Sequence, residues 1–463
     1  MHTRVPVKAS SAGRTRADVQ RYLSVVFATL LGIWLLLNAI HTGQSIVRFY
    51  TPLPIWDYWR VVVHLPEYQS FHLGVLWKQH NEHRIIFPEV VFAADMLLAH
   101  GRLLLPLILS SLCYVVTWFL LSSAVFSDNT VSKIDRWIAV LLAGVLAFFE
   151  TVTTVLAVPF LLQWTLMQAA VASSLLFLSC LKKRESAICL LGTVVSATLA
   201  TYSSGDGLIL WPLIVAVALM LRLSARSLSG LSTAAILNLK LYFVGYHFMG
   251  GLDFWNFVVH PFYTLNFVVS YISMPFGVIK AYVFGLTLGF INLLLALAFV
   301  FLAWRKRRLS SRAGIVLFSY YLFTLLTALM TAAGRINFKD PSFLAAKQVR
   351  YITVPQMNWA ALILIVLWIS SGSKHRRVLF PAFSLFFSLG FMMAFVKLDR
   401  WFSVTTRGSF LKEQQATLSI ENGNIDRELI VNYVNPDFNL VVRGLSRFAS
   451  GQFVHLLSWL SRA

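Results

Sequence analysis

The sequence predicts an all-α, polytopic membrane protein with about 11 transmembrane helices. Hydrophobic residues make up 58% of its 463 positions, charged residues only 13%, and the mean hydropathy is +0.71. Soluble domains carry about 25% charged residues, so this composition excludes a cytosolic enzyme, a secreted disulfide scaffold and a disordered regulator. The apolar residues also fall into blocks of about 20, the length that a helix needs to cross a bilayer.

Eleven such blocks follow one another along the chain. The first follows a basic segment and is too long for a cleaved signal peptide, so we interpret it as an uncleaved signal anchor. The predicted spans are approximately 22–41, 103–126, 137–158, 161–181, 186–202, 208–221, 231–249, 281–304, 313–333, 352–370 and 378–396. They divide the chain into an N-terminal segment, 1–21, a membrane domain, 22–396, and a C-terminal tail, 397–463, with an amphipathic segment.

The distribution of basic residues orients these spans. With a cytoplasmic N-terminus, the inner segments hold 20 of the 39 Lys and Arg residues but only 4 of the 19 Asp and Glu residues. Short cytoplasmic loops rich in Lys and Arg are the usual pattern. We therefore expect a multi-pass protein of a bacterial inner membrane with its C-terminus in the periplasm. The net charge of +20 is then a topology signal, and no nucleic-acid partner is expected.

The longer connecting segments all lie on the outer side of this topology. They are 42–102, 250–280, 334–351 and the tail, whereas the inner loops are short. A symmetric carrier often shows internal repeats, and we find none of the required period. The middles of the spans are also nearly free of ionisable residues, which disfavours a transporter. The functional surface is therefore expected on the outer side.

The first outer loop, 42–102, is the richest in reactive side chains. Asp57 stands in the string IWDYWR, and its aromatic neighbours are typical of an interfacial helix. An acidic group at headgroup depth costs free energy unless it is paired or used, which makes Asp57 a catalytic candidate. Pro88 and Gly101 are typical start and stop residues, and they predict a short helix over 88–100.

A polar string, HNEHR at 80–84, precedes that helix in a predicted turn. Glu82 is a second catalytic candidate, and His80, His83 and Arg84 are candidates for binding a sugar or a phosphate. A structural cluster that orients the loop is the alternative. Zinc is disfavoured, because the two histidines supply too few ligands and do not form an HExxH motif, so no metal site is assigned.

Further polar groups stand near the predicted outer ends of spans. Glu150 is either a paired carboxylate at a helix end or a substrate-binding residue. The string YSSGDG at 202–207 predicts a tight turn, and HPFY at 260–263 with the apolar stretch to Ile279 is typical of an interfacial or re-entrant segment. Three cysteines lie in or beside spans, and we expect them to be unpaired core residues: Cys113, Cys180 and Cys189.

The outer loop 334–351 is basic on the side where the positive-inside rule disfavours basic residues. Arginine offers a planar donor fork that suits phosphate oxygens. We therefore assign Arg335, Arg350 and Lys347 as phosphate-binding candidates and Tyr351 as a substrate-binding candidate. Anchoring of the basic side chains at the membrane interface is the alternative.

These features together resemble the GT-C superfamily of integral-membrane glycosyltransferases. A first span is followed by a large outer loop with an aspartate, and a basic outer loop, from Gly334-Arg335 to Arg350-Tyr351, precedes a late span. The resemblance covers most of the chain in topology but few residues in motif. It implies that Asp57 is the catalytic carboxylate and that the donor is a polyprenyl-phosphate-linked sugar. The paired DD or DE of the family is absent here, so a divalent metal stays open.

The expected reaction moves a sugar to a hydroxyl group of a periplasmic glycan, a lipid, or a protein such as a pilin; pilin arabinosyltransferases have this architecture. Asp57 would act as general base, typically worth about 10²–10⁴-fold, and outer-loop arginines would hold the departing phosphate. No nucleotide-binding motif stands on the inner loops, which agrees with a lipid-linked donor. Two other classes stay open: a lipid-linked glycan polymerase or ligase, and a lipid or glycan transporter.

Overall fold

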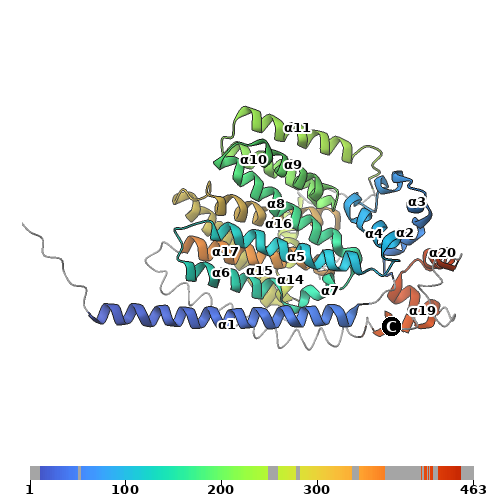
Figure 1. Ribbon diagram of the computed structural model, residues 1–463, viewed down its shortest axis with the longest axis horizontal. Coiled ribbons are helices and arrows are strands. Elements are labelled where there is room, and N and C mark those ends of the chain that lie inside the picture. Colours follow the sequence, from blue (N-terminus) through green and yellow to red (C-terminus); the bar gives the residue numbers. More distant parts are fainter. Residues whose placement is uncertain are drawn as a thin grey trace, which may run out of the picture.

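The computed structural model describes residues 11–50, 54–248, 259–277, 282–335 and 344–370, together with tail residues 408, 411–413, 415–416, 418–420 and 426–449. Every regular element in these ranges is a helix (Figure 1). Six of them contain segments long and apolar enough to cross a membrane. These helices are α1 (Ser11–Phe49), α5 (Leu104–Phe126), α8 (Leu162–Lys183), α15 (Tyr282–Arg305), α16 (Arg312–Arg335) and α17 (Thr353–Ser370). The chain is therefore a helical, multi-pass membrane protein.

Four of the other predicted spans correspond to shorter or less apolar helices. They are α6 (Lys133–Ala147), α9 (Ala187–Thr201), α10 (Leu210–Met220) and α11 (Ala225–Tyr242). The predicted span 137–158 is interrupted after α6 by the short helices η2 (Glu150–Val152), α7 (Thr153–Leu156) and η3 (Pro159–Leu161). Val158 is extended, at φ −106° and ψ 103°, as expected for the residue before a proline. The segment 378–396 lies outside the described residues, so the count of 11 stays a prediction.

The membrane-spanning helices differ in how much of their surface is buried, with α17 in the centre of the bundle and α1 at its periphery. All of the α17 window is buried, whereas only 17% of the α1 window is. A helix that is apolar on all sides belongs in the interior of a bundle, and α17 packs there against α6 and α16. The peripheral α1 is held to α6 and the residue after it by two polar contacts, from Asn38 Nδ2 to Val145 O (3.2 Å) and from Thr42 Oγ1 to Phe148 O (3.1 Å).

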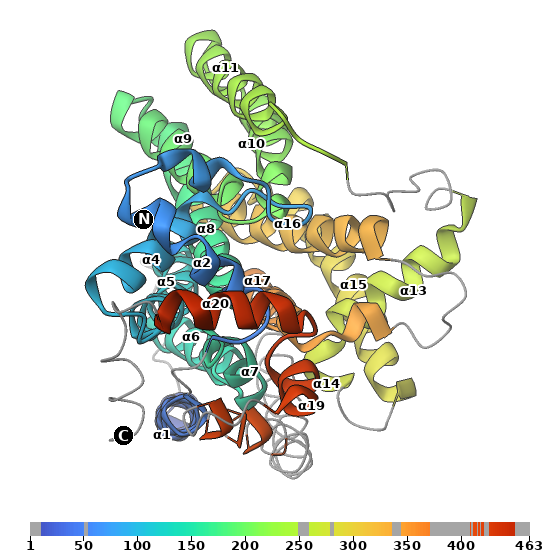
Figure 2. The ribbon, with the colours of Figure 1, turned by 90° about the vertical axis from the view of Figure 1, so that its right-hand side faces the viewer.

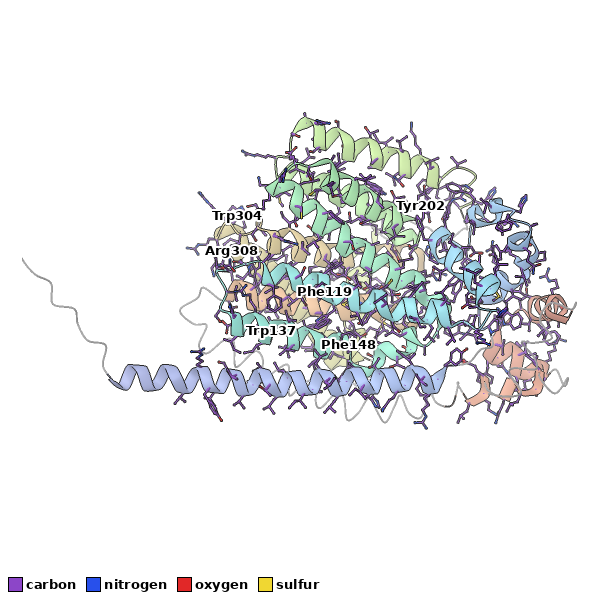
Figure 3. All side chains as sticks on the ribbon, viewed as in Figure 1. Phe119, Trp137, Phe148, Tyr202, Trp304 and Arg308 are labelled. Atoms are coloured by element: carbon purple, nitrogen blue, oxygen red, sulfur yellow. The ribbon has the colours of Figure 1, made fainter. Side chains whose placement is uncertain are left out.

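One end of the bundle, which we call the basic end, carries Lys182, Lys306 and Arg308. Lys306 and Arg308 donate to the main-chain oxygens of Ile369 (3.0 Å) and Trp368 (3.3 Å) at the end of α17. Cationic groups stabilise helix C-termini in this way, because the last carbonyls there lack partners. Figure 3 shows Trp304 and Arg308 at this end and Tyr202 near the opposite one. The predicted inner loops that the structure describes thus share this end, while the compartment that each end faces stays a prediction.

A group of short helices, the end module, covers the other end of the bundle (Figures 1 and 2). Its members come from the first loop and from the tail: α2 (Tyr58–Val63), α3 (Leu65–Gln69), η1 (Leu73–Trp77), α4 (Ile86–Leu98), α19 (Arg427–Leu429), the π-helical turn η7 (Ile430–Val434) and α20 (Phe438–Ala449). The amphipathic α20 packs on α2, so the tail returns to the first loop.

The helix predicted over 88–100 is confirmed as α4, which begins two residues earlier. Its end is followed by His100 and Gly101 at positive φ (57° and 68°). The buried Asp95 of α4 accepts the N–H groups of Leu103 (2.8 Å) and Leu105 (3.1 Å) at the start of α5. This carboxylate fixes the end module to the bundle by satisfying donors that a helix start leaves open.

Two further expectations concern α13 and the cysteines. The HPFY segment forms α13 (Pro261–Ile272), with proline at its first position, and α14 (Met274–Gly277) follows; its place relative to a membrane stays a prediction. The three cysteines are unpaired, as expected, but they are half-buried and do not belong to the fully buried core.

Candidate functional site

A cleft of about 760 Å³ lies between the end module and the bundle. Six segments far apart in the sequence line it. The lining residues are Trp56 and Asp57; His80, Asn81, Glu82 and His83; Phe160, Leu161, Gln163 and Trp164; Arg335; Gln348, Arg350 and Tyr351; and Asn435 and Pro436. The cleft therefore brings together both catalytic candidates and most of the binding candidates.

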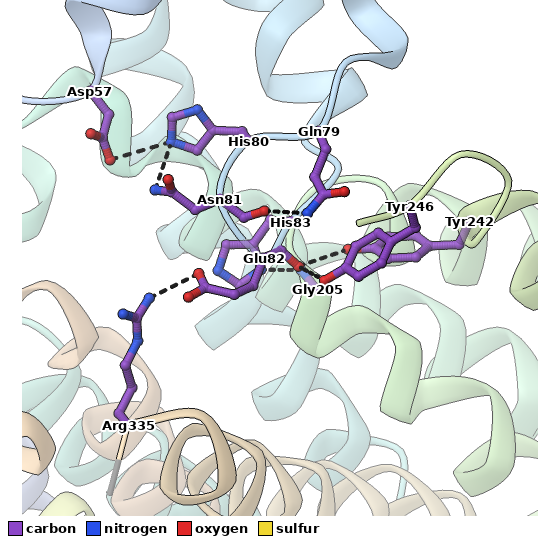
Figure 4. A network of polar contacts seen from close by, with 10 residues as sticks. All are labelled: Asp57, Gln79, His80, Asn81, Glu82, His83, Gly205, Tyr242, Tyr246 and Arg335. Carbon is purple, nitrogen blue, oxygen red and sulfur yellow. Dashed lines mark hydrogen bonds and ion pairs between the residues drawn. The ribbon is translucent and has the colours of Figure 1, made fainter. Parts of the chain in front are cut away.

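Asp57 belongs to a polar chain of three side chains. Its Oδ2 lies 3.3 Å from His80 Nε2, and His80 Nδ1 lies 3.3 Å from Arg60 Nη1 (Figure 4 shows the first contact). A guanidinium only donates, so Nδ1 accepts and Nε2 carries the proton that is donated to Asp57. His80 is buried, whereas the Asp57 side chain is 46% exposed, which leaves its carboxylate accessible from the cleft.

The environment of Asp57 favours its charged form. The hydrogen bond from His80 lowers the pKa of Asp57 below its ordinary value, burial opposes this, and the charges of Arg350 and Arg60 add to the lowering. Asp57 is therefore ionised at neutral pH. It can accept a hydrogen bond from a ligand and take up a proton.

The position of Asp57 depends on the residue before it and on the tail. Trp56 has a left-handed backbone, at φ 52°, which costs a non-glycine residue roughly 1 kcal/mol or more. Its N–H donates to Val434 O (2.6 Å), and its carbonyl accepts from Asn435 Nδ2 (2.5 Å). The tail thus holds both main-chain polar groups of Trp56, and we call these two hydrogen bonds the tail clamp.

Glu82 is the partner of Arg335. Glu82 Oε2 and Arg335 Nη2 are 2.9 Å apart across 253 residues of sequence, and both side chains are a little over one-third exposed. The main-chain oxygen of Glu82 accepts from the hydroxyl of Tyr246 (2.9 Å). The pair, drawn in Figure 4, connects the first loop to the end of α16 and neutralises the carboxylate.

The HNEHR string forms the predicted turn. His80 and His83 exchange two main-chain hydrogen bonds of 2.8 Å around Asn81, which has φ 48°. His83 Nδ1 accepts from Gly205 N–H (3.1 Å), and burial lowers the pKa of His83 to about 4, so its ring is neutral at neutral pH. A Cβ on Gly205 would lie 2.5 Å from that nitrogen. The predicted turn at 202–207 is found only at its start, because the 3-10 helix η4 (Gly205–Ile209) begins at Gly205. The start of η4 therefore supports the string.

Arg84 does not line the cleft. It is buried, its Nε donates to Tyr242 O (2.7 Å), and its other nitrogens donate to the main-chain oxygens of Trp77 and Val244. The guanidinium also lies over the Trp77 ring at 4.9 Å. With its donors satisfied by main-chain oxygens, Arg84 corresponds to the structural alternative for the string and not to a substrate contact.

The basic outer loop contributes Arg350 and Tyr351. The Arg350 guanidinium lies 5.2 Å from the centre of the Tyr351 ring, and Tyr351 is packed edge-on against Trp164. Arg350 Nε is buried and has no hydrogen-bond partner among the described residues. Two further candidates are Lys347, at the end of η5 (Leu344–Lys347), and Glu150, at the start of η2. Their side chains are not among those described.

Nine of the lining residues were not candidates in the sequence analysis. They are Trp56, Asn81, Phe160, Leu161, Gln163, Trp164, Gln348, Asn435 and Pro436. The Pro159 break before α8 and the polar Gln163 in an apolar span were signals for two of them, since polar residues within spans are often functional. Nothing local marked Asn435, because its role appears only when the tail meets Trp56.

No group of three or more His, Cys, Asp or Glu side chains in the described part of the chain is arranged to hold a metal ion. The arrangement offers instead an ionised carboxylate, an ion pair and an arginine with an unused donor around one cleft. No protein-family model matches this chain, and no curated protein matches it.

Proposed function

We propose that this protein is a GT-C-type glycosyltransferase of a bacterial inner membrane. It moves a sugar from a polyprenyl-phosphate donor to a hydroxyl group of a periplasmic glycan, lipid or protein. The observation that carries the proposal is the cleft of about 760 Å³ at one end of a bundle of apolar helices. Asp57, which is accessible and ionised, lines this cleft together with Arg335 and Arg350.

Asp57 is the base that receives the acceptor proton. The acceptor oxygen forms a bond to the anomeric carbon, the bond from that carbon to the phosphate oxygen breaks, and the polyprenyl phosphate leaves with the electron pair. Asp57 is better suited than Glu82 to accept the proton, because Glu82 is already neutralised by Arg335 at 2.9 Å. A positioned base of this kind typically contributes about 10²–10⁴-fold.

The two arginines stabilise the negative charge that develops on the leaving phosphate. Arg350 has a buried Nε without a partner among the described residues, so this donor is free for a phosphate oxygen. Arg335 uses one nitrogen on Glu82 and keeps further donors. Fixed donors around a developing charge are among the largest contributions to catalysis.

The position of the cleft suits a lipid-linked donor. It lies where the apolar α8 begins and α16 ends, so a polyprenyl chain can stay in the bilayer while its phosphate and sugar reach the polar residues. The absence of a nucleotide-binding motif from the predicted inner loops agrees with a lipid-linked donor.

Donor consumption tests the proposal. Proteoliposomes containing the protein are given undecaprenyl-phosphate-linked pentoses and hexoses, with solubilised bacterial membranes as the source of acceptors. We expect release of undecaprenyl phosphate from at least one donor, and no release from protein-free vesicles. If the protein consumes none of these donors, the proposed function is wrong.

A further inference from the structure

Trp56 has a position that interfacial anchoring does not explain. It precedes Asp57, is 42% exposed and lines the cleft. The tail clamp holds it in a strained, left-handed conformation by hydrogen bonds to both its N–H and its carbonyl. Strained residues that the surrounding structure enforces are concentrated at ligand sites. A tryptophan that only anchors the chain at an interface would need neither the clamp nor a place in the cleft.

Gln163 is the second unexplained residue of the cleft. Its side chain is 94% buried, since its residual exposure is 6%, yet its Oε1 has no hydrogen-bond partner among the described residues. An unpaired buried carbonyl oxygen is costly, and a ligand hydroxyl would satisfy it. The side-chain NH2 group can also donate, so the amide can accept a hydrogen bond from a hydroxyl group and donate one to it.

These two residues define the chemical class of the ligand. A sugar ring has a flat face of C–H groups, which fits an exposed indole, and an edge of hydroxyl groups, which fits an amide and a carboxylate. A phosphate has no apolar face, and an isoprenoid chain has no hydroxyl edge. We propose that the cleft is a sugar subsite in which the ring stacks on Trp56 and a hydroxyl donates to Gln163; this inference rests on the proposed function.

Binding in nanodiscs tests the subsite with two sets of probes. The first set is undecaprenyl phosphate and its pentose- and hexose-linked forms, and the second is a panel of free oligosaccharides. Wild type should bind at least one pentose- or hexose-linked form about 5- to 10-fold more tightly than undecaprenyl phosphate, or at least one oligosaccharide about 5- to 10-fold more tightly than Trp56→Ala does, since an aromatic contact contributes roughly this factor. A gain in the first set identifies the donor sugar, and a gain only in the second identifies an acceptor sugar.

The variants separate stacking from general packing. Trp56→Ala and Gln163→Leu should lose the gain from the sugar while binding undecaprenyl phosphate as wild type does, and Trp56→Phe should keep most of it. Phe71→Ala is the matched control, because Phe71 is exposed, lies in the same end module and has φ 53°, but does not line the cleft. It should bind every probe like wild type.

Failure of the inference and failure of the proposed function give different results. If Trp56→Ala keeps the full gain from the sugar, the subsite is wrong and the proposed function stands. The subsite is also wrong if undecaprenyl phosphate binds but no sugar in either panel adds affinity. If wild type binds neither undecaprenyl phosphate nor any sugar-bearing probe, the proposed function fails as well.

Discussion

Two regions of the end module contain the same local chemistry but differ in what surrounds them. In the cleft, Asp57 lies 3.3 Å from His80, and on the neighbouring face Glu67 also lies 3.3 Å from His64. Each region has an exposed aromatic residue in a left-handed conformation. The neighbouring face forms a separate, mostly apolar groove of about 550 Å³.

The two regions differ in how far apart along the sequence the contacting residues lie. Glu67 and His64 are three residues apart in one short segment, so their pairing follows from helix geometry alone. His80, in contrast, has Arg60 behind it, and the cleft that it faces includes residues of α16 and the tail. We conclude that a carboxylate–imidazole pair alone does not define a ligand site. What distinguishes the Asp57 pair is that residues distant in sequence surround it.

Removing Arg350 should have the largest effect on donor binding. Arg350→Ala should weaken binding of undecaprenyl phosphate about 10- to 100-fold, because a hydrogen bond to a charged group contributes roughly 1.5–3 kcal/mol. Arg350→Lys should be intermediate, since it keeps the charge but loses the fork geometry. Arg48→Ala at the end of α1 is the control. Full replacement by lysine would indicate interfacial anchoring instead.

Breaking the tail clamp should have a smaller effect than removing Arg350, and it should change only the rate of sugar transfer. Asn435→Ala removes the donor to the Trp56 carbonyl, and we expect sugar transfer to slow about 2- to 10-fold, the factor for one neutral hydrogen bond. Affinity for undecaprenyl phosphate should not change. Asn432→Ala, on an exposed residue of the same tail, should transfer normally. Equal rates for both variants would show that the clamp does not position Asp57.

Acidification should lower the stability of the protein rather than its donor affinity or transfer rate. The pKa of the buried His83 is lowered to about 4, so the unfolded chain binds more protons than the folded one between pH 6.5 and 4. Stability should therefore fall by about 1–3 kcal/mol as the pH decreases through this window. Melting curves should show less of this loss for His83→Asn than for wild type, and His72→Gln should behave as wild type. An unchanged slope for His83→Asn would contradict this assignment.

The sequence predicted the local elements well and the long-range contacts poorly. The low share of charged residues and the apolar blocks predicted the helical membrane protein, and turn residues predicted α4 and the turn that begins at Tyr202. The pairing of Glu82 with Arg335 was not predictable, although both residues were candidates, because neither residue type specifies a partner 253 positions away. Arg84 shows the opposite error, since a basic residue in a polar string is equally compatible with a buried structural role.

The interrupted third span illustrates the same limit. Its apolar composition predicts one continuous helix over 137–158, yet the helix is broken between Ala147 and Pro159, and Phe160 and Leu161 directly after the break line the cleft. Pro159 is visible in the sequence, but the break begins earlier, where η2 and α7 contact α1 and Gln356 of α17 donates to Phe149 O and Thr151 Oγ1. Composition alone does not record that packing.

The central claim is that Asp57 performs chemistry while the arginines bind the donor, and a single-turnover measurement tests it most directly. Asp57→Asn should lower the rate of sugar transfer at least about 10²-fold at saturating donor and leave donor affinity within about twofold of wild type. Glu67→Gln, which alters the matched carboxylate–imidazole pair outside the cleft, should transfer at the wild-type rate. Near-normal transfer by Asp57→Asn, with transfer abolished in Glu82→Gln, would contradict the claim and assign the base to Glu82.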